Sequence, residues 1–332
     1  MIQQRQCATD ITPMRRQTLH GAILVKISFR KRLWRSVRGY LRSRLLARHG
    51  VAIITDTKNG TLAVDPADFN VSRQLLTRGE YDWTEVMLLS RLLNRTSRIV
   101  VVGAHIGAVL IPIARMAQVR SVIAYEPSSR NYKLLMMNLI QNGLDKVVDA
   151  KNIAVGEQSG RVRLRENPIN SGNSRISTDL GGVEVALDTL DATVPNGWDS
   201  IDLLIMDVEG SEVRAMRGAP STLRKTRFFY VEFAPEQLRE QGSSVAEFVD
   251  IAQTYFKSAY IMGAAPRHLT AAAFPQYLRD LPTRRGLLLN ILFSREVGPD
   301  LIWGDSEIER SPSPVTGCAR AVRYDPSRRR GL

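Results

Sequence analysis

The chain of 332 residues has only two cysteines, Cys7 and Cys318, near its opposite ends. A disulfide framework is therefore excluded, and two isolated thiols fit a reducing compartment. The chain also lacks about 18 consecutive apolar residues, the length that a membrane-spanning helix needs. Its longest candidate, residues 99–114, contains His105 and Pro112. The first residues do not show the charged, apolar and small-residue pattern of a secretory signal, so we expect a cytoplasmic protein.

Acidic residues are scarce at both ends of the chain, and this explains the net charge of +13. Residues 1–50 carry twelve Lys or Arg against Asp10 alone, and residues 320–332 carry five Arg against Asp325. The ends therefore contribute +11 and +4, which leaves −2 for residues 51–319. Basic tails alone bind nucleic acid nonspecifically and in a salt-sensitive way. We expect no specific nucleic-acid partner.

Residues 1–50 form a basic extension in which residues 31–42 have the period of an amphipathic helix. Leu33, Trp34, Val37 and Leu41 share one face, and Lys and Arg side chains share the other. Two interpretations stay open. Either this helix lies on an anionic membrane surface and makes the protein peripheral at the membrane, or its apolar face packs on the protein's own core.

The central residues 51–297 alternate between short apolar strands and helices of 10–15 residues, after a hairpin with its turn at Lys58-Asn59-Gly60. This alternation predicts an α/β fold of the Rossmann-like class, with a mostly parallel twisted sheet and helices on both faces. Residues 161–200 break the pattern and predict a short β insertion. Residues 298–332, rich in Pro, Ser and Arg, predict a disordered basic tail. The principal expected elements are strands 98–102, 121–125, 147–155, 201–206, 227–233 and 287–294, and helices 83–93, 108–117, 129–141, 211–223 and 245–256.

A small-residue turn, residues 103–107, follows a buried strand and opens a helix, where a ligand can approach the backbone closely. Glu126 ends the next strand, 19 residues after Gly107, and a carboxylate there can accept hydrogen bonds from two ribose hydroxyls. Together the two features favour a nucleotide-type site. A packing turn and a solvated acid at a strand end are the alternatives.

A second acidic segment, Asp207-Val208-Glu209-Gly210-Ser211-Glu212, follows the apolar strand 201–206, and Glu232 lies near the end of the strand 227–233. Carboxyl ends of parallel strands meet at one edge of a sheet, which is where ligands bind. The alternative is that these acids only stabilise the N-terminus of the following helix. The four histidines form no ligand cluster, so we expect no metal site.

In order and spacing these segments resemble the FkbM family of methyltransferases, over about residues 79–293. The most specific segment is Met206-Asp207-Val208-Glu209-Gly210-Ser211-Glu212. The other segments that carry the resemblance are Gly79-Glu80-Tyr81, Val102 to Gly107, Tyr125 to Arg130 with Asn138, Asn152 to Gly156 followed by Gly160, Leu187 to Leu190, Gly218-Ala219 and Val231-Glu232.

The resemblance implies a class I methyltransferase fold, S-adenosylmethionine as the methyl donor, and a hydroxyl acceptor on a sugar, polysaccharide or secondary metabolite. It places the methionine part of the donor at the glycine turn and the ribose at Glu126. It implies donor contacts by Gly103, Ala104, His105, Gly107, Glu126, Pro127, Asn152, Ile153, Ala154 and Asp207. It implies catalytic roles for Asp207, Glu209 and Glu232.

The sequence departs from the family pattern at three positions: Val101 replaces an acidic residue, His105 an asparagine, and Ile205 a lysine. One alternative is therefore a degenerate homologue that binds the donor and acts as a membrane-surface or interaction protein. A nucleic-acid methyltransferase is less favoured, because the Asn/Asp-Pro-Pro-aromatic segment of base methyltransferases is absent. A nicotinamide-dependent oxidoreductase lacks support because no Gly-x-Gly-x-x-Gly turn occurs there.

Overall fold

The computed structural model describes residues 52–167, 170–172, 174–177, 181–263 and 267–296. The amphipathic segment predicted at residues 31–42 and the tail predicted at 298–332 lie outside these residues. Among the described helices, none has the length and apolar character to cross a bilayer.

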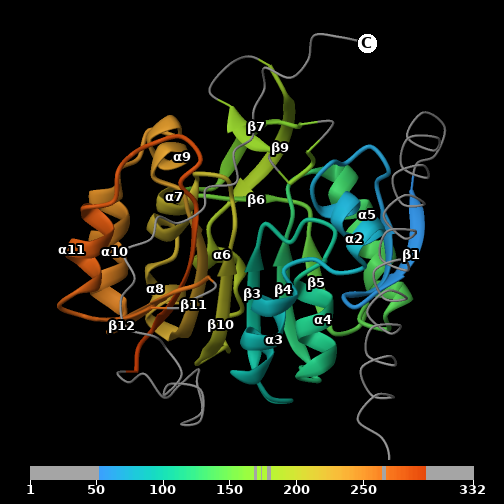
Figure 1. Ribbon diagram of the computed structural model, residues 1–332, viewed down its shortest axis with the longest axis horizontal. Coiled ribbons are helices and arrows are strands. Elements are labelled where there is room, and N and C mark those ends of the chain that lie inside the picture. Colours follow the sequence, from blue (N-terminus) through green and yellow to red (C-terminus); the bar gives the residue numbers. More distant parts are fainter. Residues whose placement is uncertain (1–51, 168–169, 173, 178–180, 264–266, 297–332) are drawn as a thin grey trace, which may run out of the picture.

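The fold is built around one eight-stranded sheet (Figure 1) in which five neighbouring strands run parallel. These five are β11 (Thr226–Phe233), β10 (Ile201–Met206), β3 (Arg98–Val102), β4 (Ser121–Tyr125) and β5 (Val148–Lys151). Beyond β11 the sheet continues with antiparallel pairs through β14 (Leu289–Ser294), β12 (Ser258–Ile261) and β13 (Arg267–Thr270). The predicted Rossmann-like α/β fold is confirmed.

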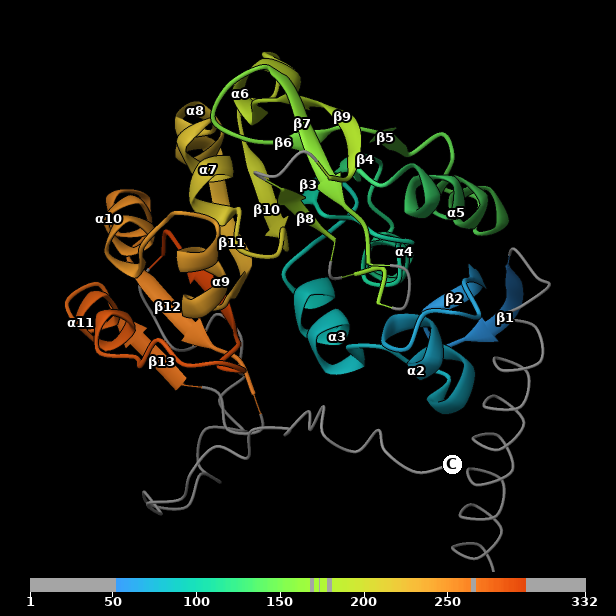
Figure 2. The same ribbon diagram turned by 90° about the horizontal axis from the view of Figure 1, so that it is seen from above.

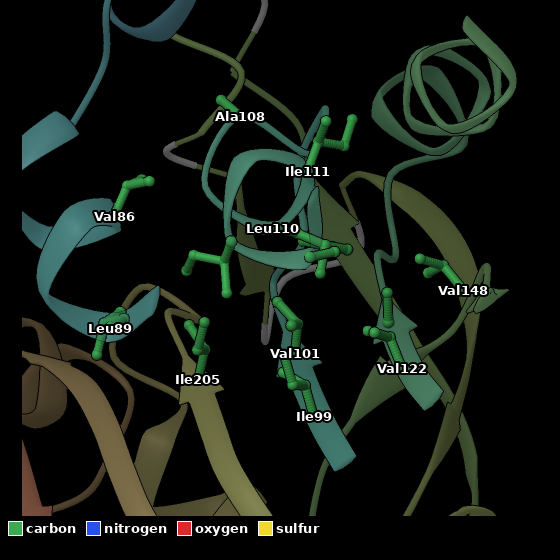
Figure 3. Close-up of a cluster of buried hydrophobic side chains, with 14 of the residues drawn as sticks. Val86, Leu89, Ile99, Val101, Ala108, Leu110, Ile111, Val122, Val148 and Ile205 are labelled. Atoms are coloured by element: carbon green, nitrogen blue, oxygen red, sulfur yellow. The ribbon is translucent and has the colours of Figure 1, made fainter. Parts of the chain in front are cut away.

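The parallel strands are apolar at successive positions because both faces of the sheet are covered. Ile99 and Val101 of β3 belong to one buried cluster, whereas Val100 and Val102 belong to the other. Figure 3 shows the first cluster, where Val101 and Ile205 lie against the helices. This face is covered by α2 (Val71–Arg78), α3 (Trp83–Arg91), α4 (Leu110–Met116) and α5 (Ser129–Gln141).

The opposite face packs against the second set of helices, which Figure 2 shows on the other side of the sheet from α4 and α5. Its core is rich in aromatic rings: Phe229 stacks on Phe256 and Phe293 at centroid distances of 5.6 and 6.0 Å. The helices there are α6 (Leu190–Thr193), α7 (Glu212–Arg217), α8 (Pro220–Lys225), α9 (Pro235–Glu240), α10 (Val245–Tyr255) and α11 (Phe274–Arg279).

The predicted β insertion is present as a separate four-stranded sheet in the order β6-β9-β7-β8. Its strands are β6 (Ala154–Val155), β7 (Gly160–Arg165), β8 (Arg175–Ser177) and β9 (Val183–Asp188). The prediction of one strand over 147–155 is wrong. The chain leaves the main sheet after Lys151 and joins the small sheet at Ala154, so Asn152 and Ile153 turn between the two at the carboxyl end of β5.

The prediction of one helix over 211–223 is also wrong, since the structure has α7 and α8. Gly218 lies between them, and a Cβ on it would lie 2.0 Å from the carbonyl oxygen of Gly156. This close approach and Pro220, at the start of α8, end the first helix and begin a second one. Sequence periodicity over the whole segment does not reveal the break.

The expected hairpin forms from β1 (Ile53–Thr57) and β2 (Gly60–Val64), and two buried asparagines attach it to the main domain. Asn138 of α5 accepts a hydrogen bond from the Ala63 N–H at 2.6 Å and donates to the Ile106 carbonyl at 2.8 Å. Asn59 donates to the carbonyl of Ala108 at 2.8 Å. The hairpin is thereby fixed against the helix that follows the glycine turn.

Candidate active site

A pocket lies at the carboxyl edge of the parallel strands, where the turns after β3, β4, β10 and β11 meet α3 and the small sheet. Ten of the predicted site residues line it: Gly103, Ala104, His105, Glu126, Pro127, Ile153, Ala154, Asp207, Glu209 and Glu232. Gly107 and Asn152 are not on its wall. The arrangement brings together segments that are more than 100 residues apart in the sequence.

Gly103, directly after β3, lies against the backbone of Asp207, directly after β10. Its φ is +86°, and a Cβ there would lie 1.8 Å from the Asp207 carbonyl oxygen. The Asp207 N–H donates to the Val102 carbonyl at 3.0 Å, and the Gly103 N–H donates to the Tyr125 carbonyl at 2.9 Å. Only glycine fits this position, so the turn sets the distance between Asp207 and the end of β4.

Glu126 is a buried carboxylate, 5% exposed, that ties the glycine turn to the start of α5. Its two oxygens accept hydrogen bonds from the His105 N–H at 2.8 Å and the Ser128 N–H at 2.9 Å. Burial raises its pKa to about 7, although both backbone hydrogen bonds oppose the shift. Each carboxylate oxygen accepts more than one hydrogen bond, so capacity for ligand hydroxyls remains.

His105 connects the glycine turn to the small-sheet segment. Its Nε2 lies 2.7 Å from the Ser171 hydroxyl, and the Ser171 carbonyl accepts from the Asn131 amide at 3.2 Å. Burial lowers the pKa of His105 to about 4, so the ring is neutral at pH 7. A neutral ring bonded to serine is a positioning group.

Three carboxylates, those of Asp207, Glu209 and Glu232, have oxygens within 4.8 Å of one another. Burial and then Asp207 raise the pKa of Glu209 to about 8, against the opposing effect of Arg175. Burial, followed by the charges of Asp207 and Glu209, raises the pKa of Glu232. The Asp207 side chain is open to the pocket but surrounded by protein, and this desolvation raises its pKa to about 6. Such a cluster can accept a proton or hold a cation.

Glu212, from the same acidic segment, has a structural role. It is 2% exposed, and its Oε1 accepts hydrogen bonds from the N–H groups of Val208 and Gly210, both at 3.2 Å. Asn152 likewise donates to the backbone carbonyls of Glu126 and Pro127, at 2.8 and 3.1 Å. Both side chains shape the turns beside the pocket.

The apolar departures, Val101 and Ile205, line the pocket floor and belong to the buried cluster on the α3 and α4 side (Figure 3). Their side chains are 3% and 5% exposed. Carboxylate or ammonium groups at these two positions would face a well-packed apolar layer. At these two positions apolar packing thus takes the place of the family's charged residues, and the polar groups of the pocket come mainly from residues after the ends of the strands and from Glu232 of β11.

Sequence reasoning missed the contribution of the start of α3 and the residues just before it, where Tyr81, Asp82 and Glu85 line the pocket. The available signal was weak: Asp82 precedes the helix that begins at Trp83. Asp82, His105 and Glu209 have φ of 42°, 49° and 54°, and among the described non-glycine residues only Gln118 joins them at positive φ. Backbone conformations of this kind cluster at functional sites.

Most of the residues that form the pocket lie in a part of the chain that matches a known family model. Residues 102–261 match the family model described as Methyltransferase FkbM domain. Over 59 residues the chain is 37% identical to the 2-O-methyltransferase NoeI of Sinorhizobium fredii, a match covering 18% of this chain and 24% of that protein. This chain thus matches only about a quarter of that relative's length.

Two solved structures are similar in fold. TYW2 of M. jannaschii in complex with AdoMet has 14% sequence identity and a TM-score of 0.39, over 74% of this chain and 87% of that one. TrmK of M. capricolum in complex with S-adenosyl-homocysteine has 10% identity and a TM-score of 0.36, over 64% and 67%.

Proposed function

We propose that this chain is an S-adenosylmethionine-dependent enzyme that methylates a hydroxyl oxygen of a small molecule or glycan, because residues 102–261 match the model of the Methyltransferase FkbM domain. The observation that carries the proposal is one pocket lined by both the Gly103–Glu126 unit and the Asp207, Glu209 and Glu232 carboxylates. The 2-O-methyltransferase activity in the name of NoeI supports oxygen as the methylated atom.

The residues present fit such a donor. Glu126 is a buried carboxylate on the pocket wall, placed to accept the ribose hydroxyls. Pro127, Ile153 and Ala154 give an apolar wall beside it for the adenine. Gly103 and Ala104 also line the pocket, and neither presents a side chain larger than a methyl group to the methionine part. In this proposal Gly107 and Asn152 act indirectly, by shaping the turns.

The donor, when bound, supplies an electrophilic sulfonium methyl group. The chain's part is then to orient the acceptor hydroxyl and to remove its proton as the oxygen–carbon bond forms and the sulfur–carbon bond breaks. Asp207 is our candidate for the proton acceptor, because its side chain is open to the pocket at the end of β10. Glu209 and Glu232 lie close enough to hold the acceptor or to share that proton.

The test is methyl transfer from radiolabelled S-adenosylmethionine into fractionated cell extract by the full chain, with binding of S-adenosylhomocysteine measured in parallel. We expect micromolar or tighter product binding and label in a small-molecule or glycan fraction as an alkali-stable ether. Binding without transfer to any fraction would support the degenerate-homologue alternative instead. Label in nucleic acid, lost on nuclease treatment, would also contradict the proposal.

A further inference from the structure

The pocket contains a large excess of negative charge. Six carboxylate side chains line it, and none of the described lining residues is Lys or Arg. The six are Asp82, Glu85, Glu126, Asp207, Glu209 and Glu232. They come from four separate parts of the chain, so the excess does not follow from one acidic stretch of sequence.

Few of these charges are compensated by the protein. Glu126 is held by two backbone N–H groups. Glu209 accepts a hydrogen bond from the Gln237 amide at 3.0 Å, and the nearest Arg175 nitrogen is 3.9 Å away. For the other four carboxylates, the described part of the chain provides no Lys or Arg nitrogen in an ion pair.

The donor cannot account for the excess. S-adenosylmethionine carries a sulfonium, an ammonium and a carboxylate, a net charge of +1, whereas six carboxyl groups line the pocket. Burial keeps some of these groups protonated near pH 7, and a bound cation favours the loss of those protons. Carboxylates held within a few ångströms of one another in a partly desolvated site favour a cationic partner. Burial is the main cause of the raised pKa values of Asp207, Glu209 and Glu232, the neighbouring carboxylates add to it, and a cation held among these groups would lower the pKa values again.

We propose that the acceptor is itself a cation, a hydroxyl compound with a protonated amino group that Glu209 and Glu232 hold while its hydroxyl faces Asp207. This inference rests on the proposed methyl transfer and narrows its substrate class. The oxygens of the three carboxylates lie within 4.8 Å of one another, a spacing that one ammonium group with three N–H donors can bridge. Anionic acceptors, such as uronates and phosphate esters, are disfavoured by the same charges.

An ammonium group fits this cluster better than a divalent metal ion. The Glu209 carboxylate already accepts a hydrogen bond from Gln237 and has the Arg175 guanidinium 3.9 Å away. A nearby guanidinium repels a divalent ion more strongly than a monovalent one. Tyr230, which lines the same side of the pocket, adds an aromatic ring of the kind that attracts organic ammonium groups.

The experiment determines the charge of the labelled product even while its chemical identity is unknown. Extract labelled by the full-length enzyme is first treated with charcoal, which adsorbs the unreacted cationic donor through its adenine ring. It is then passed at neutral pH over cation-exchange and anion-exchange columns. We expect the cation exchanger to retain the label, and acetylation of the extract with acetic anhydride beforehand to reduce labelling at least tenfold. Label in the flow-through of both columns, or on the anion exchanger, would overturn the inference and leave the methyl transfer standing. An extract that accepts no label would contradict the methyl transfer itself.

Two further measurements test the assigned carboxylates. Glu232→Gln should raise the KM for the partly purified acceptor about tenfold or more, with the affinity for S-adenosylhomocysteine nearly unchanged. Glu184→Gln, on the exposed face of β9 and outside the pocket, is the matched control. Enzyme stripped with EDTA should keep its activity. Activity that disappears with EDTA and returns with Mg²⁺ would show that a metal ion uses these carboxylates, and would overturn the inference.

Discussion

The backbone N–H of His105 donates a hydrogen bond to the Glu126 carboxylate at 2.8 Å, which joins the turn after β3 to the end of β4. The same carboxylate accepts a hydrogen bond from the Ser128 N–H at the start of α5. Glu126, which we propose binds the ribose hydroxyls, is thus held by the backbone of the two turns that flank it. A binding group fixed in this way loses little conformational freedom when the ligand arrives.

Replacing Glu126 should therefore weaken donor binding strongly. We expect Glu126→Ala to weaken S-adenosylhomocysteine binding by about 1–3 kcal/mol, roughly 5- to 150-fold in Kd, because ligand hydroxyls lose their acceptor. Titration calorimetry at constant pH measures the Kd. The control is Glu157→Gln, because Glu157 is an exposed acid that pairs with Arg217. An unchanged Kd in Glu126→Ala would remove Glu126 from the donor site.

Gly103 offers a test of the close approach between β3 and β10. Gly103→Ala combines backbone strain at φ +86° with a Cβ 1.8 Å from the Asp207 carbonyl oxygen. Gly143→Ala is a matched control, since its φ is +68° and no atom lies within 4 Å of its Cβ. We expect the control to lose about 1–2 kcal/mol of stability from strain alone.

The clash at Gly103 should add about 1–3 kcal/mol to that loss, because backbone atoms cannot move aside as a side chain does. Denaturant unfolding of both variants gives the comparison. Equal losses in the two variants would mean that the contact with Asp207 does not restrict residue 103.

The parallel core and the position of Glu126 beside the glycine turn were predictable from the sequence. Strand 98–102 is apolar at four successive positions, as a strand covered on both faces must be, and Glu126 follows the next strand directly. The break at Gly218 was not predictable, because it depends on contact with Gly156, 62 residues earlier in the chain.

The acidity of the pocket was also beyond sequence reasoning. Asp82 and Glu85 precede Asp207 by more than 120 residues, and only the fold brings α3 over the end of β10. An Asp before a helix indicates a cap in general, yet Asp82 makes no capping hydrogen bond and has a positive φ. The local pattern therefore indicated the wrong role for this residue.

The attachment of the hairpin depends on Asn138, whose amide contacts both Ala63 and Ile106 in the buried interior. Asn138→Ala leaves these backbone groups without partners, and we expect a loss of at least about 2 kcal/mol in unfolding free energy. Gln141→Ala, exposed on the same helix, should change stability by less than about 0.5 kcal/mol. Similar small effects from both variants would contradict a structural role for Asn138.

The raised pKa of Glu209 makes a prediction about stability and pH. The folded chain holds this proton up to about pH 8, whereas the unfolded chain releases it near pH 4.5. The unfolded state therefore binds fewer protons between these values, and the contribution of Glu209 to stability falls as the pH rises through this window. Glu209→Gln lacks this titration.

The measurement is the melting temperature of both proteins at pH 5, 6.5 and 8. The Tm of Glu209→Gln minus that of the wild type should increase steadily from pH 5 to pH 8. Other titrating groups, such as Glu126 and Glu212, are common to both proteins and do not affect this difference. A difference in Tm that stays constant with pH would mean that Glu209 has an ordinary pKa in the folded protein.

The assignment of Asp207 as the proton acceptor needs a direct test, because the oxygens of Asp207, Glu209 and Glu232 lie within 4.8 Å of one another. Asp207→Asn keeps the shape of the side chain and removes its charge, so single-turnover methyl transfer should slow by about 10²-fold or more if it accepts the proton. The wild-type rate should rise as the pH passes about 6, where Asp207 loses its proton, and the variant should lack this limb. Glu232→Gln, assigned to holding the acceptor, should instead raise KM and keep the limb. If Asp207→Asn transfers methyl groups at the wild-type rate while Glu209→Gln or Glu232→Gln loses the pH dependence, the proton acceptor is the neighbouring glutamate.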